Sequence, residues 1–327
     1  MSGQVVSLEA GADPAVVARL LAGHGLWVRR LSEAGVGQPL LLIEAHSRQI
    51  SDEELGGFDG VAAVFRPASA HPLVDAQPRE LVIAGVRVGG NAPAVLAAGP
   101  CAVESAAQID ELAGRCAAAG ARLLRGGAWK PRTSPYAFGG HGEQALGWLR
   151  LAAERHGLGV VTEAMSVEQV GPVAEVADLV QVGSRNMQNY PLLRAVGAAA
   201  RPVLLKRGAA ATVEEWLLAA EHCLHHGAPS VIFCERGVRG FDPAARNLFD
   251  LGAVALLRHA LGLLVMADPS HASGRRDLVL PLGKAALAAG AMGLLVEVHD
   301  HPEQALSDGP QALDPALLGD FGLGRPA

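Results

Sequence analysis

Four side chains of the kinds that bind metal ions follow apolar runs in the later part of the sequence. A thiol, an imidazole and two carboxylates make up the set: Cys101, His271, Glu297 and Asp308. With room left for water or substrate, these donors would suit one divalent transition-metal ion, namely Mn, Fe, Co or Zn. They are far apart in sequence and form no short-range metal motif, so their spacing alone is a weak signal.

Other interpretations of the same residues stay open at this point. His271 could simply cap the Asp-Pro-Ser-His turn that begins at Asp268, and Asp308 also forms an Asp-Gly turn. His299 and His301 are competing candidates for the ligand set. Composition and spacing do not choose among these possibilities.

Positive side chains form the second group that could do chemistry. Any one of them could be a solvated side chain or half of an ion pair. Arginine, however, presents a planar fork that matches phosphate and carboxylate oxygens, and lysine adds a point charge. Because many cations at one mouth would repel one another without anions, we expect substrates that carry several phosphate or carboxylate groups. The eight cations at or just after strand ends are Arg125, Lys130, Arg132, Arg185, Lys206, Arg207, Arg236 and Arg239.

The densest stretch, residues 124–136, has the sequence LRGGAWKPRTSPY. Its two glycines would let the backbone approach a ligand closely. Its two prolines would stiffen the loop, so that Lys130, Arg132 and Thr133 project from a fixed base. On composition alone, the segment could also be an ordinary rigid loop between a strand and a helix.

Eight short apolar runs, separated by amphipathic stretches of helical length, must position these side chains. This alternation predicts a (β/α)8 barrel, an α/β fold whose active site lies at the carboxyl ends of the strands. The candidate residues would therefore converge on one mouth. The strands are expected at Val95–Ala98, Arg122–Leu124, Val160–Thr162, Leu179–Val182, Val203–Leu205, Val231–Phe233, Leu263–Ala267 and Leu294–Val296. The helices are expected at Glu104–Ala119, Gly142–His156, Val167–Ala174, Pro191–Gly197, Val213–His226, Pro243–His259, Asp277–Ala289 and Pro315–Leu318.

The chain before the barrel has a different rhythm. Residues 1–66 follow the order βαββαβ, which predicts a small ferredoxin-like α/β domain whose second helix is capped by Ser51. Residues 67–90 are expected to be a linker rich in Pro and Ala, followed by a hairpin at Leu81–Val88 that would cover the bottom of the barrel. The barrel is expected over residues 91–327.

Bulk composition argues against several classes of function. The chain has 327 residues, of which 50% are hydrophobic, and a formal net charge of −6. It has no basic run, so we expect no nucleic-acid partner. Its most apolar windows end well short of the about 18 residues of a membrane span, and its start lacks the features of a secretory signal. Four cysteines without a C-x-x-C pair fit a cytoplasmic location, and Cys116, Cys223 and Cys234 are expected in the core.

Several segments together carry a resemblance to a known family. They are Ala98–Ser105, Lys130–Tyr136, Gly183–Asn189, Leu205–Gly208, Cys234–Gly237, Asp268–Asp277, Val296–His299 and Leu306–Gln311. In this order, over residues 95–313, they resemble the type I class of 3-deoxy-D-arabino-heptulosonate 7-phosphate (DAHP) synthases, in the branch with a ferredoxin-like extension. Two departures are Ser184, where the family often has Ala, and the Gly-His pair that precedes Gly142.

The resemblance implies a reaction and a role for most of the candidate residues. The family condenses phosphoenolpyruvate with erythrose 4-phosphate, the first step towards the aromatic amino acids. The metal ligands would be Cys101, His271, Glu297 and Asp308, which makes His299 only a neighbour. The resemblance places Arg185, Lys206 and Arg236 around phosphoenolpyruvate, Arg125 and Lys130 near its carboxylate and reacting end, and Arg132 and Thr133, with Ser134 as a helper, on erythrose 4-phosphate. Glu163 joins the substrate-binding set.

In the implied mechanism, the metal polarises the aldehyde and C3 of phosphoenolpyruvate attacks it. Water adds at C2 and phosphate leaves. Lys130, one of the catalytic residues together with His271 and Cys101, would either give a proton to the new alkoxide or act through its charge alone. Proton donation would be helped by a pKa that neighbouring cations lower.

Alternatives to this function remain. The related octulosonate 8-phosphate synthase uses arabinose 5-phosphate, and the sequence Lys-Pro-Arg-Thr at residues 130–133 argues against it. A non-catalytic, phosphate-binding barrel is the second alternative. The N-terminal domain could bind an aromatic amino acid as an inhibitor or serve only oligomer contacts, and the resemblance implies a homotetramer.

Overall fold

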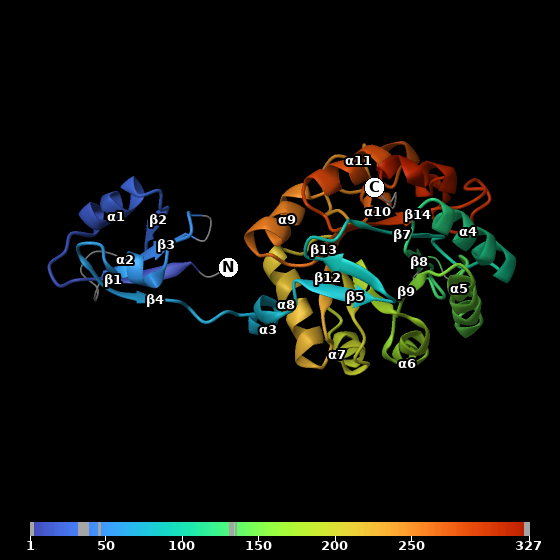
Figure 1. Cartoon of the computed structure of the whole chain (residues 1–327), viewed down its shortest axis with the longest axis horizontal. Helices are drawn as coiled ribbons and strands as arrows, with labels where there is room; N and C mark the ends of the chain where they lie inside the picture. The colour runs from blue at the N-terminus through green and yellow to red at the C-terminus, as the bar shows by residue number, and fades with distance from the viewer. Residues whose placement is uncertain (1–2, 32–38, 45–46, 131–133, 135, 324–327) are drawn as a thin grey trace. The chain divides into compact units, whose positions relative to one another are not determined.

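The computed structural model describes residues 3–31, 39–44, 47–130, 134 and 136–323. The chain divides into two compact units, Met1–Pro72 and Leu73–Ala327 (Figure 1). A short helix, α3 (Pro72–Ala76), lies in the stretch expected to be a linker. Glu221 of the barrel accepts hydrogen bonds from the first backbone N–H groups of this helix, at 3.0 and 2.9 Å, so α3 is anchored on the barrel unit.

The first unit is a four-stranded antiparallel sheet with the strand order β2-β3-β1-β4 and two helices. This is the order of a ferredoxin-like fold, as the sequence predicts. Its core contains Leu8, Leu21 and Leu41, and the Ser51 side chain caps the second helix as expected. The elements are β1 Gln4–Leu8, α1 Pro14–Gly23, β2 Val28–Arg30, β3 Leu40–Ile43, α2 Asp52–Gly56 and β4 Val61–Phe65.

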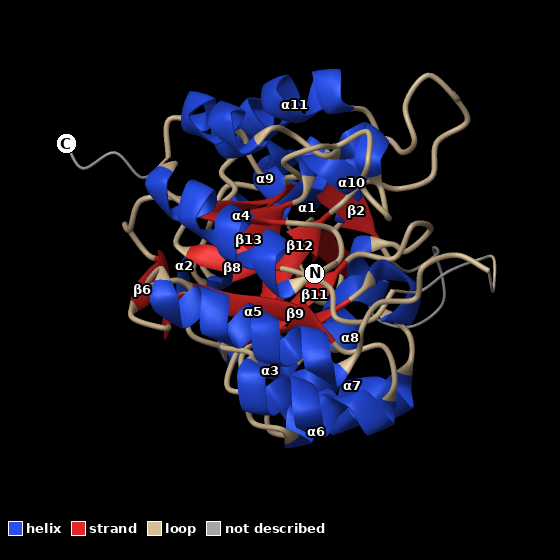
Figure 2. Cartoon of the chain, turned by 90° about the vertical axis from the view of Figure 1, so that its right-hand side faces the viewer, coloured by secondary structure: helices blue, strands red, loops and turns tan. Residues whose placement is uncertain are grey.

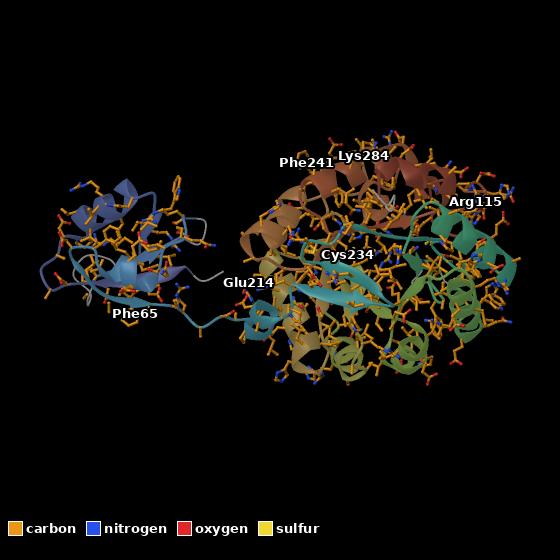
Figure 3. The ribbon with its side chains drawn as sticks, viewed as in Figure 1. Phe65, Arg115, Glu214, Cys234, Phe241 and Lys284 are labelled. Carbon is orange, nitrogen blue, oxygen red and sulfur yellow. The ribbon has the colours of Figure 1, made fainter. Side chains whose placement is uncertain are left out.

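The second unit contains a closed parallel barrel of eight strands, with neighbours in sequence order from β7 to β14. Nearly every strand residue is buried, because parallel strands are covered on both faces. Cys234 lies inside this barrel (Figure 3). The predicted barrel is confirmed, with strands β7 Val95–Gly99, β8 Leu123–Arg125, β9 Gly159–Glu163, β10 Leu179–Val182, β11 Val203–Lys206, β12 Val231–Glu235, β13 Val265–Ala267 and β14 Gly293–Glu297.

Helices surround the barrel strands (Figure 2). Their apolar sides form one large cluster with the outer faces of the strands, and α8 begins with a capping box formed by Thr212 and Glu215. No helix in the described part of the chain is long and apolar enough to cross a membrane. The helices are α4 Ala106–Ala118, α5 Glu143–Arg155, α6 Val167–Val176, η1 Ser184–Asn186, α7 Tyr190–Ala198, α8 Val213–His225, α10 Pro269–Ser273, α11 Arg276–Ala288, η3 Gly309–Gln311 and η4 Pro315–Phe321.

One predicted helix begins later than expected. The sequence predicts a helix at Pro243–His259, but the structure starts it at Leu251, where the Asp250 side chain caps the first turn. Upstream, Val238 and Leu248 form an antiparallel bridge, so the segment between them folds back on itself. The helix consists of α9 Leu251–Ala255 followed by a π-helical turn, η2 Leu256–Ala260.

A hairpin closes the amino-terminal end of the barrel. Its residues Ile83 and Val88 are buried in one apolar cluster with Val95 and Leu123, which are the first residues of two barrel strands. Only the carboxyl ends of the strands are therefore left to form a site. The hairpin strands are β5 Glu80–Ile83 and β6 Val86–Gly89.

Candidate active site

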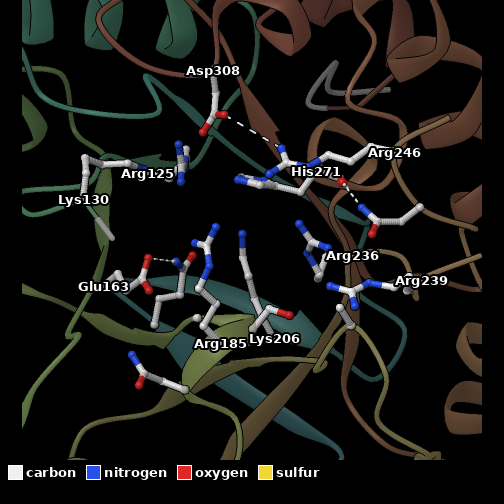
Figure 4. A pocket seen from close by; sticks show the side chains of 16 residues that line it. Arg125, Lys130, Glu163, Arg185, Lys206, Arg236, Arg239, Arg246, His271 and Asp308 are labelled. Carbon is white, nitrogen blue, oxygen red and sulfur yellow. Dashed lines mark hydrogen bonds and ion pairs between the residues drawn. The ribbon is translucent and has the colours of Figure 1, made fainter. Parts of the chain in front are cut away.

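A cavity of about 420 Å³ lies at the carboxyl ends of the strands (Figure 4). Its volume is within the range of small-molecule sites. Arg125, Glu163 and Lys206 line it from the last positions of β8, β9 and β11. The lining residues that the sequence predicts are Arg125, Lys130, Glu163, Arg185, Lys206, Arg236, Arg239, His271 and Asp308.

Three residues shortly after Lys130 are predicted to contact the sugar phosphate. Arg132 and Thr133 lie outside the described residues. Ser134 is exposed, accepts a hydrogen bond from the Tyr136 N–H at 3.3 Å, and is not among the residues that line the cavity. The roles of these three residues stay predictions.

Three of the four predicted metal ligands form one cluster. Ligand atoms of Cys101, Glu297 and Asp308 all lie within 4.8 Å of one another. The Cys101 thiol donates to Asp308 Oδ2 at 3.0 Å. The fourth residue is adjacent, because Nε2 of His271 lies 3.5 Å from Glu297 Oε1. Asp308 has a left-handed backbone with φ of 51°, a conformation that Asp tolerates better than most residues.

The two competing histidines face other groups. His299 Nε2 lies 3.5 Å from the Glu104 carboxylate. His301 Nδ1 lies 3.8 Å from Glu303. Neither belongs to the cluster of possible metal ligands found among the described residues.

The cluster combines an ionised carboxylate with a protonated thiol. Burial, followed by the charge of Glu297, raises the pKa of the Cys101 thiol to about 12. Burial also acts to raise the pKa of Glu297, but the charges of His271, Arg125 and Lys130 outweigh it and lower that pKa to about 2. A divalent cation could displace the thiol proton and take the thiolate as a ligand.

Asp268 organises one side of the site. Its Oδ2 accepts from Lys206 Nζ at 2.5 Å and from His271 Nδ1 at 2.8 Å. The second bond places a proton on His271 Nδ1 and turns Nε2 towards the cluster. Burial opposes ionisation, but the charges of His271 and Lys206 keep the pKa of Asp268 well below its usual value.

A second polar residue fixes Glu297. Gln311, which is buried, donates from Nε2 to Glu297 Oε2 at 2.6 Å. Arg125 donates to the other oxygen at 3.0 Å. The carboxylate therefore has a fixed orientation in the cluster.

Several cations in the cavity have no acidic partner. Within the described part of the chain, no carboxylate forms an ion pair with Arg185, Arg236 or Arg239. The one hydrogen bond of the Arg236 guanidinium within the described ranges is a long one, 3.5 Å to the Gly237 carbonyl. These guanidinium groups can bind anionic oxygens of a ligand.

Arg207 is not part of this set, although its place in the sequence predicts a position at the mouth. Its Nη1 donates to Glu235 at 3.0 Å and to Asp250 at 2.8 Å. Its guanidinium lies 5.8 Å from the centre of the Trp216 ring. Arg207 follows β11 directly, as predicted, but the buried Glu235 and the half-buried Asp250 hold its side chain away from the cavity, so the expected place of its charge at the mouth is wrong.

The expected pKa shift of Lys130 is also wrong. Burial acts to lower the pKa, but the Cys101 sulfur, once ionised, and the Glu297 carboxylate outweigh burial and the Arg125 charge, and raise it. The ammonium donates to the Cys101 carbonyl at 3.0 Å. Lys130 therefore stays charged at neutral pH.

Some cavity residues were not predicted. Gln181, Asn186, Arg246 and Asn247 line the cavity, and the Gln181 amide donates to Glu163 Oε2 at 3.1 Å. A polar residue inside the buried strand Leu179–Val182 is the signal that could have identified Gln181.

The chain matches known proteins over most of its length. Residues 69–323 match the sequence profile of the DAHP synthetase I family. Phospho-2-dehydro-3-deoxyheptonate aldolase of Thermotoga maritima is 45% identical over 284 residues, which cover 86% of this chain and 84% of the relative. A 2-dehydro-3-deoxyphosphooctonate aldolase of Pelobacter propionicus is 34% identical over 263 residues, which cover 73% of this chain and 95% of that protein.

Solved structures give the same result. The crystal structure of the Thermotoga maritima phospho-2-dehydro-3-deoxyheptonate aldolase (DAHP synthase) has a TM-score of 0.76 and 39% sequence identity, and the match covers 98% of this chain and 95% of that one. A truncated 3-deoxy-D-arabino-heptulosonate 7-phosphate synthase from the same organism has a TM-score of 0.71 and 43% identity, covering 77% of this chain and 94% of that one. These similarities confirm the predicted family. The chain belongs to the DAHP synthetase I family of enzymes.

Proposed function

We propose that the chain condenses phosphoenolpyruvate with erythrose 4-phosphate to give DAHP and inorganic phosphate. The observation that carries this proposal is one cavity with two features. It contains a set of side chains suited to metal binding, and it contains guanidinium groups that pair with no carboxylate among the described residues. Either feature alone would fit many reactions. Together they fit two phosphorylated substrates, one of which has an aldehyde that must be polarised.

The residues present fit a divalent transition metal. Cys101, His271, Glu297 and Asp308 would hold it, since three of them already cluster and Nε2 of His271 faces the cluster. A thiolate with an imidazole favours Mn, Fe, Co or Zn over Mg or Ca. When bound, such an ion would supply Lewis-acid polarisation of the aldehyde oxygen.

The cations divide into held and available groups. Lys206 forms an ion pair with Asp268, and Arg125 forms one with Glu297. These pairs fix the positions of the two positive charges. Arg185 and Arg236 are available for phosphate oxygens. We propose that Arg185, Lys206 and Arg236 bind phosphoenolpyruvate, with Arg125 and Lys130 near its carboxylate and reacting end, while Arg132, Thr133 and Ser134 bind erythrose 4-phosphate.

These contacts would orient C3 of phosphoenolpyruvate towards the aldehyde carbon. The raised pKa of Lys130 favours an electrostatic role at the developing alkoxide over proton donation. Glu163 is a cavity carboxylate outside the metal-binding cluster, so it is available to orient the water that adds at C2. Cleavage of the C–O bond then releases phosphate.

If Glu163 has this role, Gln181→Leu should lower kcat about tenfold, because the carboxylate loses one charge-assisted hydrogen bond. KM for phosphoenolpyruvate should stay within about twofold of the wild-type value, since the cations are unchanged. Steady-state kinetics measures both constants. Gln77→Leu is a matched control, because Gln77 is buried and bonds to Val231 N, at the start of β12 and away from the mouth. A wild-type kcat in Gln181→Leu would contradict the role given to Glu163.

The choice of sugar tests the proposed reaction. The related octulosonate enzymes named above keep arabinose 5-phosphate open as a substrate. Phosphate release from phosphoenolpyruvate should be fast with erythrose 4-phosphate and much slower with arabinose 5-phosphate. The reverse preference would assign the chain to the octulosonate reaction. No phosphate release with either sugar would indicate a non-catalytic, phosphate-binding barrel.

We also propose that the first unit binds an aromatic amino acid as an inhibitor. The unit has a hollow that could take an aromatic ring, lined by Val5, Ser7, Leu40, Phe65, Arg66 and Pro67. Calorimetry with Phe, Tyr and Trp should detect binding to the full chain. Absence of both binding heat and inhibition would contradict this proposal and favour a role of the unit in oligomer contacts alone. The homotetramer stays a prediction.

A further inference from the structure

Glu104 lies where three segments of the active-site mouth meet. It is in the turn between β7 and α4, three residues after Cys101. It does not line the cavity, and its side chain is only 16% exposed. Its contacts reach the segment that carries Asp308 and the loop that carries Lys130.

The carboxylate holds the Asp308 segment at two points. Oε1 accepts from the Leu306 N–H at 2.9 Å, two residues before Asp308. Oε2 lies 3.5 Å from His299 Nε2, two residues after Glu297. The His301 N–H donates to Nδ1 of His299 at 3.0 Å, so Nε2 is the ring nitrogen left to face Glu104 and the Gln108 amide, whose Nε2 lies 3.3 Å away.

The backbone of Glu104 holds the second loop. Its carbonyl accepts from His141 Nε2 at 3.0 Å. The His141 ring packs edge-on against Phe138 and Trp148, with centroids 5.1 and 5.5 Å away. The base of this loop is closed by a bond from the Lys130 N–H to the Gly139 carbonyl at 2.9 Å. His141 therefore joins the end of the Lys130 loop to the turn that follows Cys101.

We propose that Glu104 is a positioning residue that fixes Asp308 for metal binding and couples the metal site to the sugar-phosphate loop. This inference rests on the proposed metal site and reaction. Asp308 needs external support, because the residues between β14 and η3 form no regular helix or strand among those described and Asp308 itself has a left-handed backbone. Outer groups that orient metal ligands typically change affinity about 10- to 100-fold.

Arg115, on the helix that follows Glu104, offers a matched control. Arg115 on α4 forms ion pairs with Asp300 and Asp314 and lies at the outer side of the barrel (Figure 3). It ties the same stretch of chain to α4, and among the described residues its hydrogen bonds go to Asp300 and Asp314, not to Glu104 or the metal-binding cluster. Arg115→Ala thus removes an anchor of the segment and leaves the Glu104 contacts in place.

The test is calorimetric titration of Mn²⁺ into the chelator-treated full chain. Glu104→Ala should weaken Mn²⁺ binding about 10- to 100-fold. Glu104→Gln, which keeps an acceptor for the Leu306 N–H, should recover part of the loss. Arg115→Ala should bind Mn²⁺ within about threefold of wild type, since it does not orient a ligand. Thermal unfolding of each metal-free variant gives the stability change separately.

The coupling has its own variant. His141→Phe keeps an aromatic ring beside Phe138 and Trp148 but removes the bond to the Glu104 carbonyl. It should raise KM for erythrose 4-phosphate about fivefold or more, the loss of roughly one hydrogen bond, with the Kd for Mn²⁺ unchanged. Glu104→Ala keeps the backbone carbonyl that accepts from His141, so it should change the Kd for Mn²⁺ and leave KM for erythrose 4-phosphate within about twofold of the wild-type value.

The outcomes separate the possible failures. If wild-type chain takes up no Mn²⁺, the proposed metal site fails and this inference with it. If wild type binds Mn²⁺ and Glu104→Ala binds it equally well, only the positioning role fails. Equal weakening in Arg115→Ala and Glu104→Ala would also overturn it, because any anchor of the segment would then suffice. An unchanged KM in His141→Phe would overturn the coupling.

Discussion

Replacement of Asp268 by Asn should lower kcat/KM about 100-fold or more and destabilise the barrel by about 3–5 kcal/mol. The Asp268 carboxylate is buried and accepts hydrogen bonds from both Lys206 and His271. Its amide substitute would leave the Lys206 ammonium buried without a counter-charge. It would also free the His271 ring to turn. The activity loss and the stability loss therefore have the same physical origin.

The pKa of Asp268 sets the pH range of this effect. Its pKa is held well below the usual value, so the ionised form contributes stability at neutral pH and loses it only as the pH falls through the lowered pKa. Chemical denaturation at neutral pH measures the change. Asp178→Asn is the control, because Asp178 pairs with Arg150 next to the amino-terminal end of a strand, away from the mouth. Wild-type kcat/KM in Asp268→Asn would contradict the arrangement described above.

Replacement of Cys101 by Ser should lower the rate roughly a thousandfold, because loss of Lewis-acid stabilisation is worth several kcal/mol. A serine hydroxyl is a far weaker metal ligand than a thiolate. Tight binding of a divalent ion should be lost at the same time. The fold should remain, since Ser is close to Cys in size.

Cys223→Ser controls for the chemical change itself. Cys223 is buried in α8 and its thiol pKa is also raised to about 12 by burial, but it is not in the metal-binding cluster. This variant should lose some stability and keep its metal content and rate. Metal analysis with phosphate-release kinetics gives the comparison. If Cys101→Ser kept a full equivalent of metal and the wild-type rate, Cys101 would not be a ligand.

The fold and most of the cavity could be predicted, because strand ends carry the information. Parallel strands in a barrel bring their carboxyl ends together, so Arg125, Glu163 and Lys206 had to meet once the strands were identified. The type of residue then indicated the chemistry. Glu297, the last residue of β14, could be placed at the mouth by the same reasoning.

Side-chain direction and charge balance could not be predicted from the sequence. Lys206 and Arg207 are adjacent, yet one lines the cavity and the other turns to Glu235 and Asp250. The direction of the Lys130 pKa shift depends on Cys101 and Glu297, which lie at or just after the ends of other barrel strands. Both outcomes are set by tertiary neighbours.

The most direct test of the account is DAHP formation by the chelator-treated chain, with and without added Mn²⁺. Phosphoenolpyruvate and erythrose 4-phosphate are supplied together, and product, released phosphate and bound metal are measured on the same samples. DAHP and phosphate should form in equal amounts, and only after about one Mn²⁺ per chain has bound. Equal rates with and without metal, in samples shown to be metal-free, would contradict it.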